Sequence, residues 1–70
     1  MKYEKVRELR KKAGLTQAAV GAILGVSTRA YTHYEAGDRD MPPRVLIALA
    51  DYYGVTVDYL LGRSEKRNEI

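Results

Sequence analysis

Four polar side chains able to hydrogen-bond with nucleic acid bases fall within one short stretch of the sequence. At about 100° per residue, a helix starting after Ser27 turns all four to one side. They are Thr28, Arg29, Thr32 and His33. Arginine can bond a guanine edge with two hydrogen bonds, threonine can pack its methyl on thymine, and histidine donates or accepts according to its tautomer. This face therefore has the chemistry to read base edges, although on an isolated helix such a set is more often an ordinary solvated surface.

The elements that must position this face are helical. Apolar residues recur at helical spacing throughout, and no segment keeps the strict alternation of a half-buried strand. The sequence therefore predicts an all-α domain of five short helices. The first runs from Tyr3 to Ala13, and Gly14 suits the left-handed position beyond its end. Its inward face is expected to consist of Tyr3, Val6, Leu9 and Ala13.

The second and third predicted helices start after hydroxyl residues that cap helix N-termini, Thr16 and Ser27. Gly25 lies in the turn between them, where a residue that tolerates positive φ is needed, and Gly21 permits the two helices to cross closely. The third helix is predicted to end near Glu35. The expected inward residues are Val20, Ile23 and Leu24 on the second helix and Tyr31 and Tyr34 on the third.

Two further helices complete the predicted domain over residues 1–62, and residues 63–70 form a polar tail. Pro43 suits the first position of the fourth helix, and Thr56 caps the short fifth one. Residues expected to face the core are Val45, Leu46, Leu49, Ala50, Tyr53, Leu60 and Leu61. Four apolar residues are expected to be left outside this small core, where they would form a dimer patch: Tyr52, Val57, Tyr59 and Ile70.

The composition argues against catalysis, a cofactor and a metal site. The 70 residues contain one histidine and no cysteine, so thiolate ligands, thiol nucleophiles and disulfides are excluded. No apolar run approaches the about 20 residues that cross a bilayer, and no secretory leader is evident. We therefore expect a soluble cytoplasmic protein without membrane association, and not an enzyme.

The charge is unevenly distributed along the chain. The net charge is +3, and residues 1–12 carry six of the twelve lysines and arginines. The stretch 45–62 instead contains two aspartates and no basic residue. A basic segment is compatible with a polyanionic partner, and it is equally compatible with the solvated face of a helix.

Four short motifs recur in the order typical of one protein family. They are Leu15-Thr16-Gln17, Leu24-Gly25-Val26-Ser27, Tyr34-Glu35-Ala36-Gly37, and Leu49-Ala50 through Gly54-Val55. With these motifs, the chain resembles the Cro/cI-type (XRE) helix-turn-helix family of repressors from Val6 to Gly62. The resemblance implies a compact five-helix, lambda-repressor-like DNA-binding domain with the helix-turn-helix at helices 2 and 3.

The resemblance also implies roles for individual residues. The third helix would lie in the major groove of double-stranded DNA, with Arg29 as the first candidate base reader beside Thr28, Thr32 and His33. Thr16 and Gln17 would hold the start of the second helix against a phosphate, as the amide hydrogens of a helix N-terminus favour. A pairing of Arg10 with Glu35 would be a framework contact. The loop after Gly37 is commonly basic in the family, whereas here Asp38 and Asp40 flank Arg39, so Arg39 and Arg44 are the less certain phosphate contacts.

The sequence therefore predicts a sequence-specific transcriptional regulator, a repressor or repressor-like switch. It is expected to bind an inverted-repeat operator as a homodimer, without a small-molecule effector. The alternative is a helix-turn-helix module that binds another protein, such as an antitoxin-like partner, because fold alone does not fix function.

Overall fold

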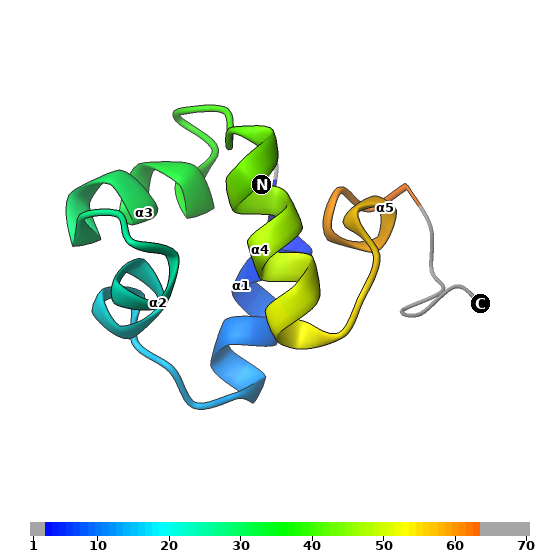
Figure 1. Ribbon diagram of the computed structural model, residues 1–70, viewed down its shortest axis with the longest axis horizontal. Helices are drawn as coiled ribbons and strands as arrows, with labels where there is room; N and C mark the ends of the chain where they lie inside the picture. The colour runs from blue at the N-terminus through cyan, green and yellow to red at the C-terminus, as the bar shows by residue number, and fades with distance from the viewer. Residues whose placement is uncertain (1–2, 64–70) are drawn as a thin grey trace.

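A computed structural model describes residues 3–63, and within them the chain forms five α-helices. They are α1 (Glu4–Lys12), α2 (Gln17–Leu24), α3 (Thr28–Ala36), α4 (Pro43–Tyr53) and α5 (Val57–Leu60). Figure 1 shows α2 and α3 at one end of the molecule and α5 at the other, with α1 and α4 between them. The all-α, five-helix prediction is confirmed. Apart from Arg63, the predicted tail of residues 63–70 lies outside the described residues.

The helices α2, α3 and α5 begin where their capping residues predicted. The hydroxyls of Thr16, Ser27 and Thr56 each accept a hydrogen bond of 3.0 Å from the backbone amide three residues further on. Each bond satisfies one of the amides that lack a partner in the first turn of a helix. Pro43 occupies the first position of α4, where a missing N–H costs nothing.

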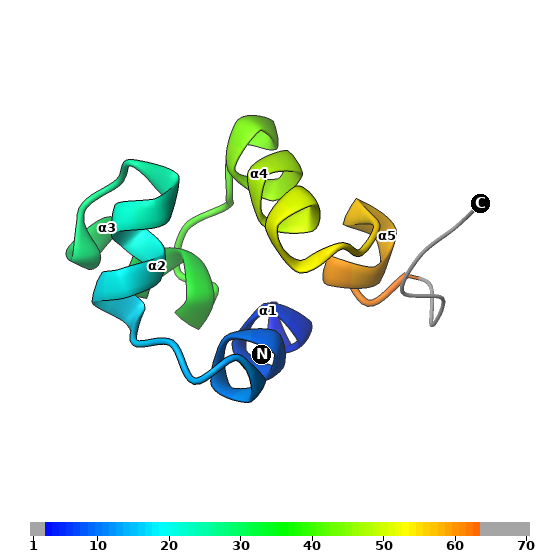
Figure 2. The same cartoon turned by 60° about the horizontal axis from the view of Figure 1, so that its bottom comes forward.

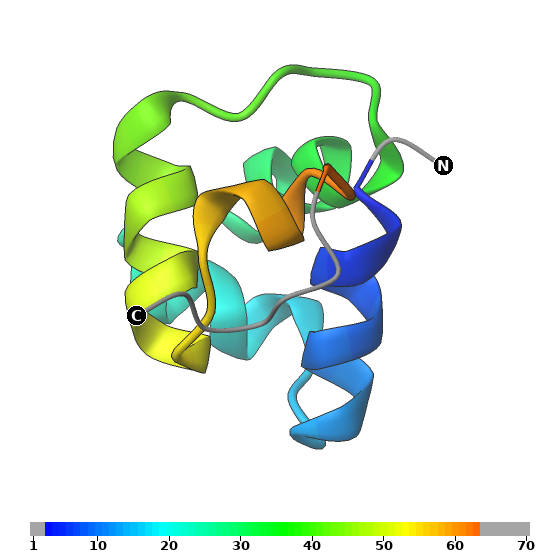
Figure 3. The ribbon, with the colours of Figure 1, turned by 90° about the vertical axis from the view of Figure 1, so that its right-hand side faces the viewer.

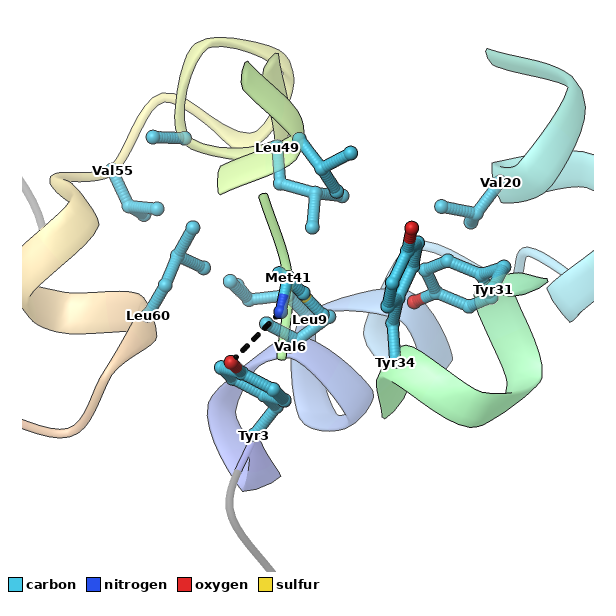
Figure 4. Close-up of a cluster of buried hydrophobic side chains, with 12 residues drawn as sticks. Tyr3, Val6, Leu9, Val20, Tyr31, Tyr34, Met41, Leu49, Val55 and Leu60 are labelled. Carbon is cyan, nitrogen blue, oxygen red and sulfur yellow. Dashed lines mark hydrogen bonds between the residues drawn. The ribbon is translucent and has the colours of Figure 1, made fainter. Parts of the chain in front are cut away.

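One apolar core unites residues from α1 to α5, as Figure 4 shows. The fully buried side chains include Val6 from α1, Val20 from α2, Tyr31 from α3, Leu49 from α4 and Leu60 from α5. Figures 2 and 3 show α5 beside α1 and α4, so the last helix closes the end of the core that α2 and α3 leave open. Burial of side chains from every helix makes the position of each helix depend on the others.

Three predictions about burial were wrong. Ile23 was expected to face inward, but it is 47% exposed, because Val20, Gly21 and Leu24 already occupy the inward side of α2. Ala13 is exposed, since α1 ends one residue earlier. Val57 and Tyr59 were expected to lie outside the core, whereas both are partly buried against it. Of the expected dimer patch, Tyr52 is 50% exposed, and Ile70 lies outside the described residues.

A long-range hydrogen bond fastens α1 to the segment that enters α4. The buried hydroxyl of Tyr3 accepts from the backbone amide of Met41 at 3.1 Å, as the dashed line in Figure 4 shows. Both residues are buried, so this bond satisfies polar groups that water does not reach. The loop after α3 is therefore held to the body of the domain at its far end.

Candidate nucleic-acid interface

The turn between α2 and α3 depends on two glycines. Gly25 has φ of 72°, the left-handed conformation in which most side chains are strained. Gly21 lies against the start of α3, and a Cβ at this position would stand 3.2 Å from the carbonyl oxygen of Val26. The predicted roles of both glycines, in the turn and at the close crossing, are confirmed. The two helices are consequently packed with their backbones close together.

The helix α3 separates its residues as the sequence predicted. Tyr31 and Tyr34 are buried, whereas Thr28 and Arg29 are exposed. Within residues 3–63, Arg29 forms no hydrogen bond or ion pair. A guanidinium has five N–H donors in a planar fork, so this side chain offers its full donor set to a ligand. The outer face of α3 is therefore open at its N-terminal end.

The other two residues of this face have partners inside the protein. Thr32 is partly buried, and its hydroxyl lies 3.0 Å from Oε1 of Gln17 and 2.9 Å from the carbonyl oxygen of Thr28. His33 is partly exposed, with Nδ1 3.4 Å from the Oδ2 atom of Asp38. That contact is long for a hydrogen bond. Sequence reasoning predicted neither the Thr32 contacts nor the His33 contact.

A buried carboxylate anchors the C-terminal end of α3 to the body of the domain. Glu35 is only 2% exposed, and its two oxygens accept four hydrogen bonds. Arg10 donates two of them, from Nε at 2.8 Å and from its terminal nitrogen at 3.0 Å. Tyr31 donates from its hydroxyl at 2.7 Å, and Gln17 donates from Nε2 at 3.2 Å. The pairing of Arg10 with Glu35 that the family resemblance implied is confirmed.

This cluster changes the acidity of its members. Burial by itself would raise the pKa of Glu35, but the hydrogen bonds from Arg10, Tyr31 and Gln17 outweigh it and lower the pKa. The hydrogen bond to Glu35 raises the pKa of Arg10. Burial, followed by the hydrogen bond to Glu35, raises the pKa of Tyr31 well above its ordinary range. The cluster therefore contains an ionised acid, a charged guanidinium and a neutral phenol.

The residues predicted to bind phosphate lie at the start of α2, in the loop after α3 and in the first turn of α4. Thr16 is exposed and caps α2, and Gln17 is the first residue of that helix. Arg39 is in the loop between α3 and α4, and Arg44 is in the first turn of α4. Both arginines are exposed and form no ion pair within the described part of the chain. Figure 1 shows this loop leaving the C-terminal end of α3 and leading into α4.

No helix between residues 3 and 63 has the length and apolar character needed to cross a membrane. The same residues contain no cluster of three or more histidine, cysteine, aspartate or glutamate side chains suited to a metal ion.

Comparison with known proteins identifies the protein family to which the chain belongs. The model of the helix-turn-helix family matches residues 6–60, which is most of the chain. The chain therefore belongs to the Cro/cI-type (XRE) helix-turn-helix family.

Individual relatives and solved structures agree with this assignment. The chain is 37% identical over 68 residues to the HTH-type transcriptional regulator ImmR of Bacillus subtilis (strain 168), covering 94% of this chain and 54% of ImmR. It is 34% identical over 67 residues to AnsR of the same organism, covering 96% of this chain and 58% of AnsR. The chain thus spans just over half the length of these relatives.

Among solved structures, the P22 c2 repressor in complex with a synthetic operator is similar, with a TM-score of 0.81 and 33% identity. The alignment covers 91% of this chain and 97% of the repressor chain. A transcriptional regulator from Listeria innocua has a TM-score of 0.84 and 28% identity, over 100% of this chain and 63% of that one.

Proposed function

We propose that this chain is a sequence-specific double-stranded DNA-binding transcriptional regulator, and specifically a repressor, that reads the major groove with α3. The observation that carries the proposal is the outer face of α3, where Arg29 is exposed and has no partner within residues 3–63. An unpaired guanidinium on a helix anchored from behind suits bidentate recognition of guanine. The similarity to a repressor bound to its operator supports the same assignment.

The proposed roles divide the site into base-reading and phosphate-binding residues. The base readers are Thr28, Arg29, Thr32 and His33. Since the hydroxyl hydrogen of Thr32 has acceptors within the protein, the methyl is the part of that side chain proposed to meet a thymine. Thr16 and Gln17, together with Arg39 and Arg44, are proposed to contact phosphates and to fix the position of α3 along the groove.

Further properties belong to the same proposal. We expect a homodimer on an inverted-repeat operator, with recognition helices reading half-sites about one helical turn (~34 Å) apart. The protein is proposed to act in the cytoplasm without a cofactor or catalytic activity, in keeping with its single histidine and its lack of cysteine.

Selection of duplexes from a random-sequence pool tests this function. We expect enrichment of an inverted repeat containing a guanine opposite each Arg29. Binding to the selected duplex should also weaken with salt, with a log–log slope of about −0.9 for each phosphate neutralised by lysine or arginine. A pool that remains unenriched at low salt would contradict the proposed function.

A second candidate, binding to another protein, is favoured by the exposed apolar side chains. Ile47 and Tyr52 on α4 are 55% and 50% exposed. An antitoxin-like partner or a second copy of the chain could cover either residue. Association through apolar contacts should respond little to salt, so sedimentation at two ionic strengths separates this function from phosphate-driven binding.

A further inference from the structure

The amide of Gln17 lies between two side chains of α3. Its Nε2 atom donates to Oε1 of Glu35 at 3.2 Å, and its Oε1 atom is 3.0 Å from the hydroxyl of Thr32. Gln17 itself is the first residue of α2. The two contacts therefore connect the start of α2 to the middle and the end of α3.

The chemistry of Glu35 determines which way round this amide lies. Because the pKa of Glu35 is lowered by its donors, the carboxylate is ionised and can only accept hydrogen bonds. It therefore faces the NH2 end of the Gln17 amide, which leaves the carbonyl end toward Thr32. The Thr32 hydroxyl is a donor of suitable geometry at that end.

The two contacts leave one group of Gln17 for a ligand. A glutamine NH2 has two hydrogens, and Glu35 takes one of them. The second hydrogen has no acceptor within residues 3–63. A held amide with one free donor at the start of a helix suits a phosphate oxygen, since it loses little rotamer freedom on binding.

We propose that Thr32 is a positioning residue, whose hydroxyl holds the Gln17 amide so that its free N–H points to a DNA phosphate. The inference rests on the proposed function and deepens it. The single hydroxyl hydrogen of Thr32 is shared between Gln17 and the carbonyl of Thr28, so this hydrogen is not available to a base. Thr32 thus has two proposed roles. Its hydroxyl orients Gln17 for a phosphate contact, and its methyl packs against a base.

Two substitutions at the same position separate these roles. Thr32→Val keeps a branched apolar side chain and removes the hydroxyl, so affinity should fall about three- to tenfold for every duplex sequence alike. Thr32→Ser keeps the hydroxyl and removes the methyl, so affinity should fall only on duplexes with the preferred base at one position. A Thr32→Val loss confined to one base position would overturn the inference.

A double-mutant cycle tests whether Thr32 acts through Gln17. If it does, Thr32→Val should cost nothing further in a Gln17→Ala background, because the amide it holds is already gone. Losses that simply multiply would show that the hydroxyl acts independently of Gln17 and would overturn the inference. Neither variant should change the dependence of affinity on salt, because neither removes a charge.

Nuclear magnetic resonance of the protein without DNA gives a readout that does not depend on the proposed function. The side-chain NH2 resonances of Gln17 should be well dispersed in the wild type and in Thr32→Ser. In Thr32→Val these resonances should move toward those of a solvent-exposed glutamine side chain. Unchanged Gln17 resonances in Thr32→Val would overturn the inference even if DNA binding is demonstrated. Failure of the wild type to bind any duplex would overturn the proposed function and the phosphate contact with it, while a resonance shift in Thr32→Val would still show that Thr32 holds the Gln17 amide.

Discussion

The buried and the exposed polar side chains of α3 differ in how many hydrogen-bond partners they have within the protein. On the inner side, the buried carboxylate of Glu35 accepts four hydrogen bonds from three residues. On the outer side, Arg29 has no partner within the described residues. Because the carboxylate and its hydrogen-bond donors hold α3 in position, the exposed side chains of the helix need no partners within the protein. Stability and ligand binding should therefore depend on different residues, and mutations should separate the two.

Removal of the inner anchor should have the largest effect. Glu35→Ala leaves the Arg10 guanidinium without its carboxylate and the Tyr31 hydroxyl without an acceptor. The free energy of unfolding, measured in urea, should fall by about 3 kcal/mol or more. Glu8→Ala, at an exposed acid on α1, is the matched control and should change stability by less than about 0.5 kcal/mol. A loss at Glu35 no larger than that of the control would remove the contrast between the two sides.

Acid should weaken the same anchor to a smaller extent. The pKa of Glu35 is lowered in the folded protein, so its contribution to stability is present above the unfolded value of 4.5. This contribution should be lost as the pH falls from 4.5 toward the folded pKa, since the unfolded chain then binds the proton more readily. Protonation keeps the side chain in place, which is why the loss is smaller than that of Glu35→Ala. Urea titrations across this range should show a flatter acid dependence in Glu35→Gln than in the wild type.

A change on the outer side should affect binding and leave the fold intact. Arg29→Ala should cost about 1 to 3 kcal/mol on the preferred duplex and relax discrimination at one base pair. Gln17→Ala should instead weaken all sequences alike. Fluorescence anisotropy with preferred and scrambled duplexes measures both losses. Equal losses of Arg29→Ala on the two duplexes would show that this residue does not read bases.

The smallest of these effects is expected in the turn that joins the two helices. A Cβ at Gly25 would meet no atom within 4 Å, so the cost of Gly25→Ala is the backbone conformation alone. Thermal unfolding should show a loss of about 1 kcal/mol. Gly25→Asn should lose less, because asparagine tolerates the left-handed region better than alanine. An alanine variant as stable as the wild type would mean that the turn relaxes to a negative φ.

Local rules were sufficient to predict much of this fold. Thr16 and Ser27 cap the helices they were predicted to cap, and Gly21 lies at a close crossing, because each of these features depends on residues near in sequence or on the absence of a side chain. The burial of Tyr31 and Tyr34 likewise follows from helical periodicity. The Arg10–Glu35 pair came only from the family resemblance.

The predictions that failed depend on tertiary packing. Ile23 is on the flank of the inward side of α2, where its burial is decided by the neighbouring helix and not by periodicity. Tyr59 is in a helix of four residues, too short to define an apolar face. The contact of Thr32 with Gln17 joins residues 15 apart on two helices, and only the crossing of those helices brings them together. The proposed roles of the site residues remain predictions.

The hydrogen bond between Tyr3 and Met41 also provides a natural reporter of the whole domain. Its partners are 38 residues apart and both are buried, so we expect the bond to open only when Tyr3, at the start of α1, leaves the core. Exchange of the Met41 amide hydrogen with solvent deuterium should then proceed through nearly complete unfolding and not through local fraying. The exchange rate of that single amide would give the global stability of the domain without denaturant.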